Sequence, residues 1–307
     1  MSRILSKKGE VNMKNYIILG DSTCDLSTEI RIEYNIDYAV MNFLCEEKES
    51  PASLDWESIS PKEFYDLMRN GKKVTTTQVP YNIFYNKFTE CAENNLDVLY
   101  ISCSSGLSGS VNTARLVKDE ILEKYPNIKI EIVDSLISSL GQGSLLIEAS
   151  KLRKEGKTIE EVRDYIESIK LKVHQAGTVA SLEYLKRAGR IKASKAFFGN
   201  LLGVKPIIIS DIKGQNYAYK KVKGRKNSLL QLVEEMKENI VDSESQTIYV
   251  SHADSIEDAM FVKEIIEKEI KCKDVYINYI GPVVGASVGP GTIIVFCRGE
   301  EVTIEGE

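Results

Sequence analysis

The first residues that could do chemistry lie between Asn15 and Ser27, where an apolar run ends in Gly20, Asp21 and Ser22. A serine on a turn after a buried strand can act as a nucleophile if a histidine base takes its proton. One large group of hydrolases carries its nucleophile in a Gly-Asp-Ser placed in this way. Ser22 is therefore the first candidate for a catalytic residue.

The rest of the chain does not supply the partners that this hydrolase chemistry needs. It has two histidines, His174 and His252, and neither follows an acidic residue by three positions, as an Asp-x-x-His motif requires. The Gly-x-Asn-Asp oxyanion loop is also missing. The residues favour a strand-to-helix turn in which Asp21 or Ser22 caps the following chain. A serine esterase using Ser22 or Ser105 stays open as an alternative.

Two further segments, both expected to be loops, are rich in hydroxyl groups. One is the loop 75–78, Thr-Thr-Thr-Gln, and the other is the serine- and glycine-rich loop 102–110. Hydroxyls and free backbone N–H groups in such loops can bind an anion. For either loop taken alone, helix capping is the simpler interpretation. The chain has no P-loop and no dinucleotide fingerprint, so a phosphorylated ligand is the weaker alternative.

The elements that must position these loops alternate between strands and helices over the first 150 residues. This alternation predicts a parallel sheet, whose loops at the carboxyl ends of strands lie on one rim. Ser60 and Thr158 each precede a Glu by three residues, which predicts a capping box. The second half mixes strands and helices, with segment 215–224 resembling an edge strand. We expect an N-terminal lobe over 13–172, a C-terminal lobe over 173–307 and a flexible extension over 1–12.

Composition limits the kinds of protein that the sequence can encode. Hydrophobic residues make up 43% and charged residues 28% of the 307 positions, with a formal net charge of −5. An acidic balance gives no reason to expect nucleic-acid binding. No apolar run reaches the length of a membrane span, and the N-terminus lacks the apolar core of a secretory signal. Six scattered cysteines without zinc spacing are typical of reduced thiols, so we expect a cytoplasmic protein.

Several motifs in order resemble the DegV family of bacterial fatty-acid-binding proteins, the FakB type, from about Tyr16 to Arg298. The segments that carry the resemblance are DSTCDL, TTQV, SSGLSGSVNTA, LEYLKRAGRI, FFGNLLGVKPII and VGASVGPGT. The resemblance implies an α/β fold of two domains, the N-terminal one with a parallel sheet and the C-terminal one mixed, with a long-chain fatty acid between them.

The resemblance also implies which residues bind the ligand and what the protein does. The carboxylate would meet the residues at the motif positions, which here are Thr76, Thr77, Ser104, Ser105, Ser108 and Arg190. The protein would carry no cofactor and catalyse nothing. It would present the fatty acid to a separate fatty acid kinase subunit, which makes the acyl phosphate for phospholipid synthesis.

Two features qualify what the resemblance implies. The closing motif of the family has a histidine where this chain has Ser287, so the head group would meet a hydroxyl in place of an imidazole. The altered site could change head-group geometry, weaken presentation to the kinase or suit another amphiphile. We expect the acyl tail among apolar residues at the lobe junction, namely Phe197, Phe198, Leu201, Leu202, Val204, Ile83, Phe84 and Leu107. The basic strip over 220–226 would be a solvated strand edge or a partner surface.

Overall fold

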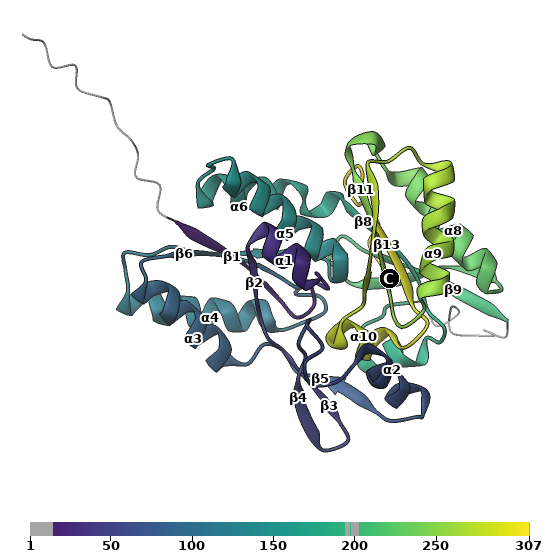
Figure 1. The fold of residues 1–307 in the computed structure, drawn as a ribbon, viewed down its shortest axis with the longest axis horizontal. Coiled ribbons are helices and arrows are strands. Elements are labelled where there is room, and N and C mark those ends of the chain that lie inside the picture. Colours follow the sequence, from purple (N-terminus) through teal and green to yellow (C-terminus); the bar gives the residue numbers. More distant parts are fainter. Residues whose placement is uncertain (1–14, 194–196, 198–202, 307) are drawn as a thin grey trace, which may run out of the picture.

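The computed structural model describes residues 15–193, 197 and 203–306. Its first half is built on a parallel sheet in the order β2-β1-β6-β7, with helices on both faces (Figure 1). The strands are β1 (Tyr16–Asp21), β2 (Ile36–Ala39), β6 (Asp97–Ser102) and β7 (Ile130–Asp134). The helices are α1 (Thr28–Tyr34), α3 (Tyr81–Glu93), α4 (Ser110–Lys124), α5 (Ser139–Lys154) and α6 (Ile159–Ile169). Every residue of β6 is buried, as expected for a strand covered on both faces.

A small antiparallel sheet extends from this half toward the second half of the chain. Its order is β4-β3-β5, and α2 follows β4 along the chain. The bounds are β3 (Asn42–Cys45), β4 (Lys48–Pro51), β5 (Val74–Thr76) and α2 (Pro61–Arg69). Ser60 caps α2 in a capping box with Glu63, and Thr158 caps α6 with Glu161, which confirms both predicted capping boxes. The sheet itself was not predicted from the sequence.

The second half of the chain forms a mixed sheet in the order β10-β9-β8-β13-β11-β12. Its strands are β8 (Val173–Thr178), β9 (Val204–Ser210), β10 (Asn216–Lys223), β11 (Thr247–His252), β12 (Asp274–Tyr279) and β13 (Ile293–Arg298). Helices α8 (Arg225–Asn239) and α9 (Ile256–Glu269) cover one face, and short helices α7 (Glu183–Ala188) and α10 (Pro282–Val288) complete the lobe. Two 3-10 turns cover Lys170–Lys172 and Ser243–Ser245.

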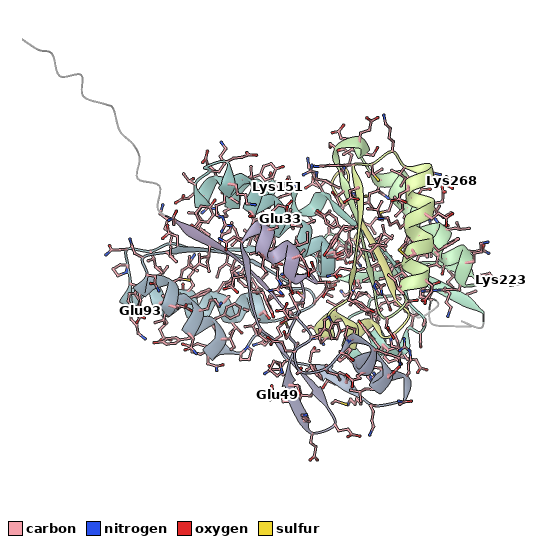
Figure 2. The ribbon with its side chains drawn as sticks, in the orientation of Figure 1. Glu33, Glu49, Glu93, Lys151, Lys223 and Lys268 are labelled. Atoms are coloured by element: carbon pink, nitrogen blue, oxygen red, sulfur yellow. The ribbon has the colours of Figure 1, made fainter. Side chains whose placement is uncertain are left out.

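Strand β10 lies at the edge of this sheet, which confirms the predicted edge strand. Lys223 ends the strand at the periphery of the molecule (Figure 2). Charged side chains on an edge oppose pairing with a strand of another molecule.

Helix α5 joins the two halves. It packs against β1 and β6 of the parallel sheet and also against β8, β11 and β13 of the mixed sheet. Ten of its residues are buried, which leaves it little polar surface and explains why its sequence lacks a regular amphipathic stripe. The larger buried apolar cluster accordingly runs from Ile18 on β1 to Phe296 on β13.

The fold class expected from the sequence is confirmed: the protein has a two-domain α/β fold with a parallel sheet followed by a mixed sheet. Strand β8, which opens the mixed sheet along the chain, begins at Val173. The division into 13–172 and 173–307 stays a prediction, and the expected flexible extension over 1–12 lies outside the described residues.

Candidate ligand-binding site

Hydroxyl-bearing loops from both halves of the chain meet at one cavity, which we call the hydroxyl pocket. Its empty volume is about 660 Å³, with the open mouth included. The lining residues are Thr23, Met41, Thr76, Thr77, Gln78, Cys103, Leu107, Ser108, Gly109, Ser138, Arg190, Asn216, Val283, Val284, Ser287 and Val288. The first half supplies most of the hydroxyls, and α10 supplies a row of valines. The pocket therefore has a polar side and an apolar side.

Asp21 fixes the floor of the pocket. It is fully buried at the end of β1, and its Oδ1 accepts hydrogen bonds from the Thr23 backbone N–H at 3.0 Å and the Thr23 hydroxyl at 2.5 Å. Its Oδ2 accepts from the Tyr100 hydroxyl at 2.7 Å and the Cys103 backbone N–H at 2.9 Å. These bonds tie the loop after β1 to the loop after β6 and hold Thr23 and Cys103 at the pocket.

Ser22 points away from the pocket and is not placed to attack a substrate. It is fully buried, and its Oγ accepts the backbone N–H of Met41 at 2.9 Å. His174 contacts the carbonyl of Glu300, while His252 Nδ1 accepts the backbone N–H of Ser255. Burial lowers the pKa of His252 to about 4, which makes it a weak base. Ser22 therefore shapes the turn after β1.

Thr77 belongs to the pocket lining and has a buried, unpaired hydroxyl. Its backbone N–H donates to the carbonyl of Asn42 at 3.0 Å, which fixes the end of β5 against β3. Its Oγ1 is buried and has no hydrogen-bond partner among the described residues. A buried hydroxyl without a partner costs about 1–3 kcal/mol, and a ligand oxygen at this place would recover that cost.

Ser108 is held by a relay of hydrogen bonds that leaves its own proton for the pocket. The Val79 backbone N–H donates to Ser110 Oγ at 3.0 Å, and the Ser110 and Ser108 hydroxyls lie 3.0 Å apart. The Ser110 backbone N–H also donates to Ser108 Oγ, at 3.3 Å. Because Ser110 already accepts from Val79, its hydroxyl can donate to Ser108. The Ser108 proton is then free to donate to an anion.

Gly109 allows the two hydroxyl loops to approach each other. A Cβ atom at this position would lie 2.2 Å from Oε1 of Gln78. Gln78 Nε2 donates to the hydroxyl of Thr113 at 2.8 Å, which anchors the Thr76–Gln78 loop on α4. A side chain at Gly109 would separate Thr77 from Ser108.

Arg190 lies at the mouth of the pocket. Its Nε donates to the carbonyl of Leu107 at 3.0 Å, and its Nη1 donates to that of Ala188 at 2.5 Å. The side chain is exposed and has no carboxylate partner among the described residues. Asn216 Nδ2 donates to the Arg190 carbonyl at 3.0 Å, so β10 also holds the mouth. Arg190 thus brings a positive charge beside the hydroxyls.

A second cavity adjoins the hydroxyl pocket and shares Thr76, Arg190 and Ser287 with it. Its empty volume, with the open mouth included, is about 570 Å³. The remaining lining residues are Val74, Thr75, Arg187, Ala188 and Ala286. Ser287 stands between the two cavities on α10, at the motif position where the resemblance leads us to expect histidine.

The structure does not bring every predicted site residue to the pocket. Ser104 is fully buried and donates to the Gly214 carbonyl at 2.7 Å, which links the loop after β6 to the β9–β10 turn. Ser105 is exposed, and its backbone N–H donates to Asp134 at 3.0 Å. Neither serine lines the pocket, because the turn directs Ser104 toward the second half and Ser105 toward solvent.

The apolar residues expected to surround the acyl tail also divide into those that line the pocket and those that do not. Leu107 lines the pocket, whereas Phe84 packs against the Tyr100 ring at 5.0 Å inside the core. Phe197 is 9% exposed and lies under the ammonium group of Lys221 at 4.9 Å, outside the lining. Ile83 and Val204 are also outside it. Phe198, Leu201 and Leu202 fall outside the described residues.

Several lining residues were not predicted from the sequence. Ser138 follows β7 and therefore lies on the same rim as the other loops, a placement that the strand order could have indicated. Val283, Val284 and Val288 were missed because α10 has only seven residues and starts with Gly281-Pro282. A helix this short does not show a clear hydrophobic period in the sequence.

Comparisons with known proteins agree with this architecture. The family model described as an uncharacterised protein of the DegV family matches residues 16–299. A DegV domain-containing protein of Clostridium perfringens is 38% identical over 288 residues, which cover 94% of this chain and 99% of that protein.

Two solved structures resemble the whole fold. One is described as showing fatty acid binding of a DegV family protein from Thermus thermophilus, at 25% identity and a TM-score of 0.83, covering 93% of this chain and 99% of the other. The other is DegV, described as a fatty acid binding protein from Bacillus subtilis, at 27% identity and a TM-score of 0.79, with the same coverage of both chains.

Proposed function

This chain belongs to the DegV family, and from that premise we propose that it binds a long-chain fatty acid in the hydroxyl pocket. Support comes from the two related structures described as fatty-acid-binding proteins. The observation that carries the proposal is the mixed lining, in which Thr77 and Ser108 line the same cavity as the valines of α10. A ligand with one polar end and a long apolar remainder matches such a lining.

The tail would supply most of the affinity. A chain of sixteen carbons has about 14 methylenes, and burying them at roughly 0.8 kcal/mol each offers about 11 kcal/mol before the costs of association. The valines of α10, together with Met41 and Leu107, offer the apolar surface for the first part of that chain.

The head group would be oriented by neutral donors. An isolated buried carboxylate is very costly, so its oxygens need hydrogen bonds. Thr77 Oγ1 and the Ser108 hydroxyl have protons to give, and Thr76 and Ser287 lie on the same lining. Hydroxyls pair with the oxygens without a bidentate clamp, which leaves the carboxylate able to react. Arg190 would add a charge at the mouth.

We further propose that the protein is a carrier that presents the carboxylate to a separate fatty acid kinase. The exposed guanidinium groups of Arg187 and Arg190 at the mouth would meet the phosphate that the kinase delivers. Lys220 and Arg225 of the basic strip are paired with Glu235 and Asp258, so they are less available to a partner. A cytoplasmic location remains part of this proposal.

The serine esterase is the weaker candidate function. The Ser22 hydroxyl is buried and accepts from Met41, while Ser105 lies outside the pocket lining. The two histidines are engaged elsewhere.

Among the described residues, no helix is both long and apolar enough to span a bilayer. No group of three acidic, cysteine or histidine side chains in the described ranges is arranged to hold a metal ion.

The proposed function is tested by extracting the ligand from denatured protein and identifying it by mass spectrometry. We expect one long-chain fatty acid per chain, and delipidated protein should bind palmitate again in a calorimetric titration. Hydrolysis of phenyl acetate by the same sample would indicate esterase activity. Absence of fatty acid together with no palmitate binding would overturn the proposal.

A further inference from the structure

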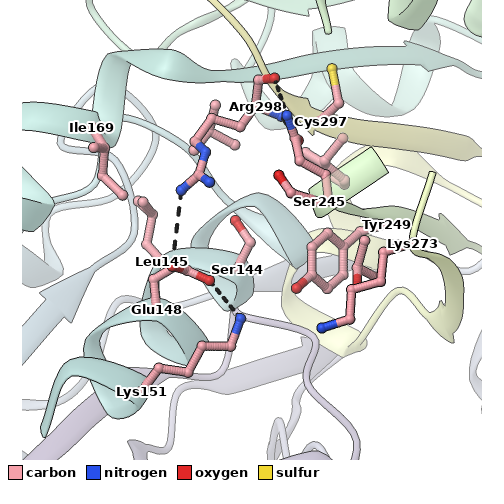
Figure 3. A pocket seen from close by; sticks show the side chains of 14 residues that line it. Ser144, Leu145, Glu148, Lys151, Ile169, Ser245, Tyr249, Lys273, Cys297 and Arg298 are labelled. Carbon is pink, nitrogen blue, oxygen red and sulfur yellow. Dashed lines mark hydrogen bonds and ion pairs between the residues drawn. The ribbon is translucent and has the colours of Figure 1, made fainter. Parts of the chain in front are cut away.

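Another cavity, distinct from the hydroxyl pocket and the cavity beside it, lies where α5 faces the mixed sheet (Figure 3). We call it the α5 pocket. Its empty volume, with the open mouth included, is about 590 Å³, and it shares no lining residue with the hydroxyl pocket. One wall is the α5 face that carries Ser144, Glu148 and Lys151, and the opposite wall comes from β11, β13 and Lys273. Both halves of the chain therefore contribute to it.

Cationic groups gather at this pocket from three separate elements. Lys151 lies on α5, Arg298 ends β13, and Lys273 precedes β12. Glu148 is the single carboxylate of the lining, and it pairs with Lys151 at 2.6 Å. Three cations against one carboxylate leave the pocket with a formal charge of +2. An acidic protein with a net charge of −5 has no general excess of cations to place there.

Two polar groups of the pocket have no partner of their own. Neither the Lys273 ammonium group nor the Tyr249 hydroxyl makes a hydrogen bond or an ion pair with any residue in the described ranges. Figure 3 shows both groups pointing toward α5, into the space that the Lys151 ammonium also borders. The Tyr249 ring is held edge-on against Tyr276 at 6.0 Å, so its hydroxyl keeps a fixed direction.

Arg298 is positioned by its backbone and only loosely paired through its side chain. Gln246 Oε1 accepts the Arg298 backbone N–H at 2.8 Å, and Gln246 Nε2 donates to the Arg298 carbonyl at 2.8 Å. The guanidinium group lies 3.9 Å from Glu148, beyond hydrogen-bond distance (Figure 3). A fixed backbone with a loosely paired guanidinium suits binding of a ligand oxygen with little reorganisation.

From this arrangement we propose that the α5 pocket binds a phosphate monoester. A dianion matches the formal charge of +2 better than a carboxylate would. Lys273, Arg298 and the Tyr249 hydroxyl would contact the phosphate oxygens. Leu145, Ile169 and Phe296 lie buried beneath the lining and form a closely packed base for the pocket. Because the walls come from both halves, the bound ester would also hold them together.

The test is calorimetric titration of the full chain with phenyl phosphate at about pH 8, where the phosphate is a dianion. We expect saturable binding of one equivalent, and binding of benzoate at least roughly tenfold weaker because its single charge gains less. Equal affinity for the two probes, or no saturation with phenyl phosphate, would overturn the proposal.

Three substitutions locate the binding. Lys273→Gln should weaken phenyl phosphate binding roughly tenfold, and Tyr249→Phe should weaken it by a smaller factor. Lys271→Gln is the matched control, since Lys271 is exposed two positions away and pairs with Glu244 outside the pocket. If Lys271→Gln weakens binding as much as Lys273→Gln, the effect is one of general charge and the site is refuted.

Glu148→Gln should change the affinity for phenyl phosphate in the opposite direction. Removing the carboxylate frees Lys151 and Arg298 for the ligand, so phenyl phosphate should bind several-fold more tightly. General damage to the fold cannot produce tighter binding. Weaker binding of phenyl phosphate by Glu148→Gln would contradict the assignment.

Discussion

At the scale of single residues, Thr77 and Ser108 carry the polar side of the hydroxyl pocket. The Thr77 hydroxyl is buried without a partner, and the Ser108 hydroxyl ends a relay that starts at the Val79 backbone. Both side chains are held by their loops, so each can turn its hydroxyl toward a carboxylate at little cost in conformational freedom.

The substitution Thr77→Val should lower palmitate affinity without lowering the stability of the ligand-free protein. Palmitate affinity should fall roughly tenfold or more, because a hydrogen bond to a charged group is lost. The ligand-free protein should unfold at the same denaturant concentration or a higher one, since the lost hydroxyl was unpaired. Calorimetric titration and urea denaturation measure the two effects. Ser105→Ala, at an exposed position outside the lining, is the control that should change neither. Unchanged palmitate affinity in Thr77→Val would remove Thr77 from the head-group site.

Ser287→His tests the departure of this chain from the family motif. An imidazole at this point of α10 would lie on the lining shared by both cavities at the mouth. We expect palmitate affinity to rise as pH falls through about 6.5, where histidine gains its charge. The unsubstituted protein should lack that rise. Titrations at several pH values give the comparison, and identical profiles would show that position 287 does not contact the carboxylate.

At the scale of elements, α10 decides the shape of the apolar side. Its seven residues place three valines on the pocket, and it packs against α2, α7 and β5. Gly285 permits the close approach to α2, because a Cβ atom there would lie 2.5 Å from the Tyr65 hydroxyl. That hydroxyl is buried and donates to the Ile280 carbonyl at 2.6 Å, so it cannot move aside freely.

Gly285→Ala should therefore displace α10 and weaken two properties together. We expect a loss of about 1–3 kcal/mol in the free energy of unfolding, as for other overpacked positions, and a weaker affinity for palmitate. The double variant Gly285→Ala, Tyr65→Phe removes the closest atom and should recover part of both losses. Urea denaturation and calorimetry give the coupling energy. Strictly additive losses would mean that Tyr65 does not set the position of α10.

Sequence patterns predicted the long elements well and the short ones poorly. Helices α2 and α6 were placed by their capping boxes, and β10 was recognised as an edge strand by its alternation. Strands β3 and β4, with four residues each, and helix α10 were missed. Elements this short carry too few residues to show a period, and tertiary contacts fix them.

The site shows the same division between local and non-local information. Thr76, Thr77 and Ser108 were predicted as binding residues from the family motifs, and all three line the pocket. Motif membership could not show that Ser104 points to Gly214 and Ser105 to solvent. The direction of each side chain depends on the turn after β6 and on the second half of the chain, which no local pattern describes.

At the scale of the whole molecule, a buried seam around Asp25 joins the two halves. Its Oδ2 accepts from the Ser139 hydroxyl at 2.6 Å, and its Oδ1 accepts from the Gly281 backbone N–H at 2.8 Å. Ser251 lies 3.1 Å from Ser139, and Asn278 donates to the Asp25 carbonyl. Burial raises the pKa of Asp25 from 3.8 to about 7, with the hydrogen bonds from Ser139 and Gly281 opposing that rise.

This shift gives stability a definite dependence on pH. Because the folded pKa lies above the unfolded one, the folded state binds the extra proton between about pH 4 and pH 7. The contribution of Asp25 to stability is therefore full below pH 4 and is lost as pH rises through 7. Asp25→Asn keeps an uncharged acceptor toward Gly281 and should flatten the dependence in that window. Urea denaturation across the pH range measures it, and an unchanged slope in the variant would contradict the assignment to Asp25.

The most direct measurement of the central claim is a crystal structure of the protein with palmitate that carries a bromine atom at its tail. We predict a carboxylate within hydrogen-bond distance of Thr77 and Ser108, and an anomalous bromine peak buried between the two halves of the chain. A fatty acid bound on the outer surface, or a carboxylate remote from both hydroxyls, would contradict the account.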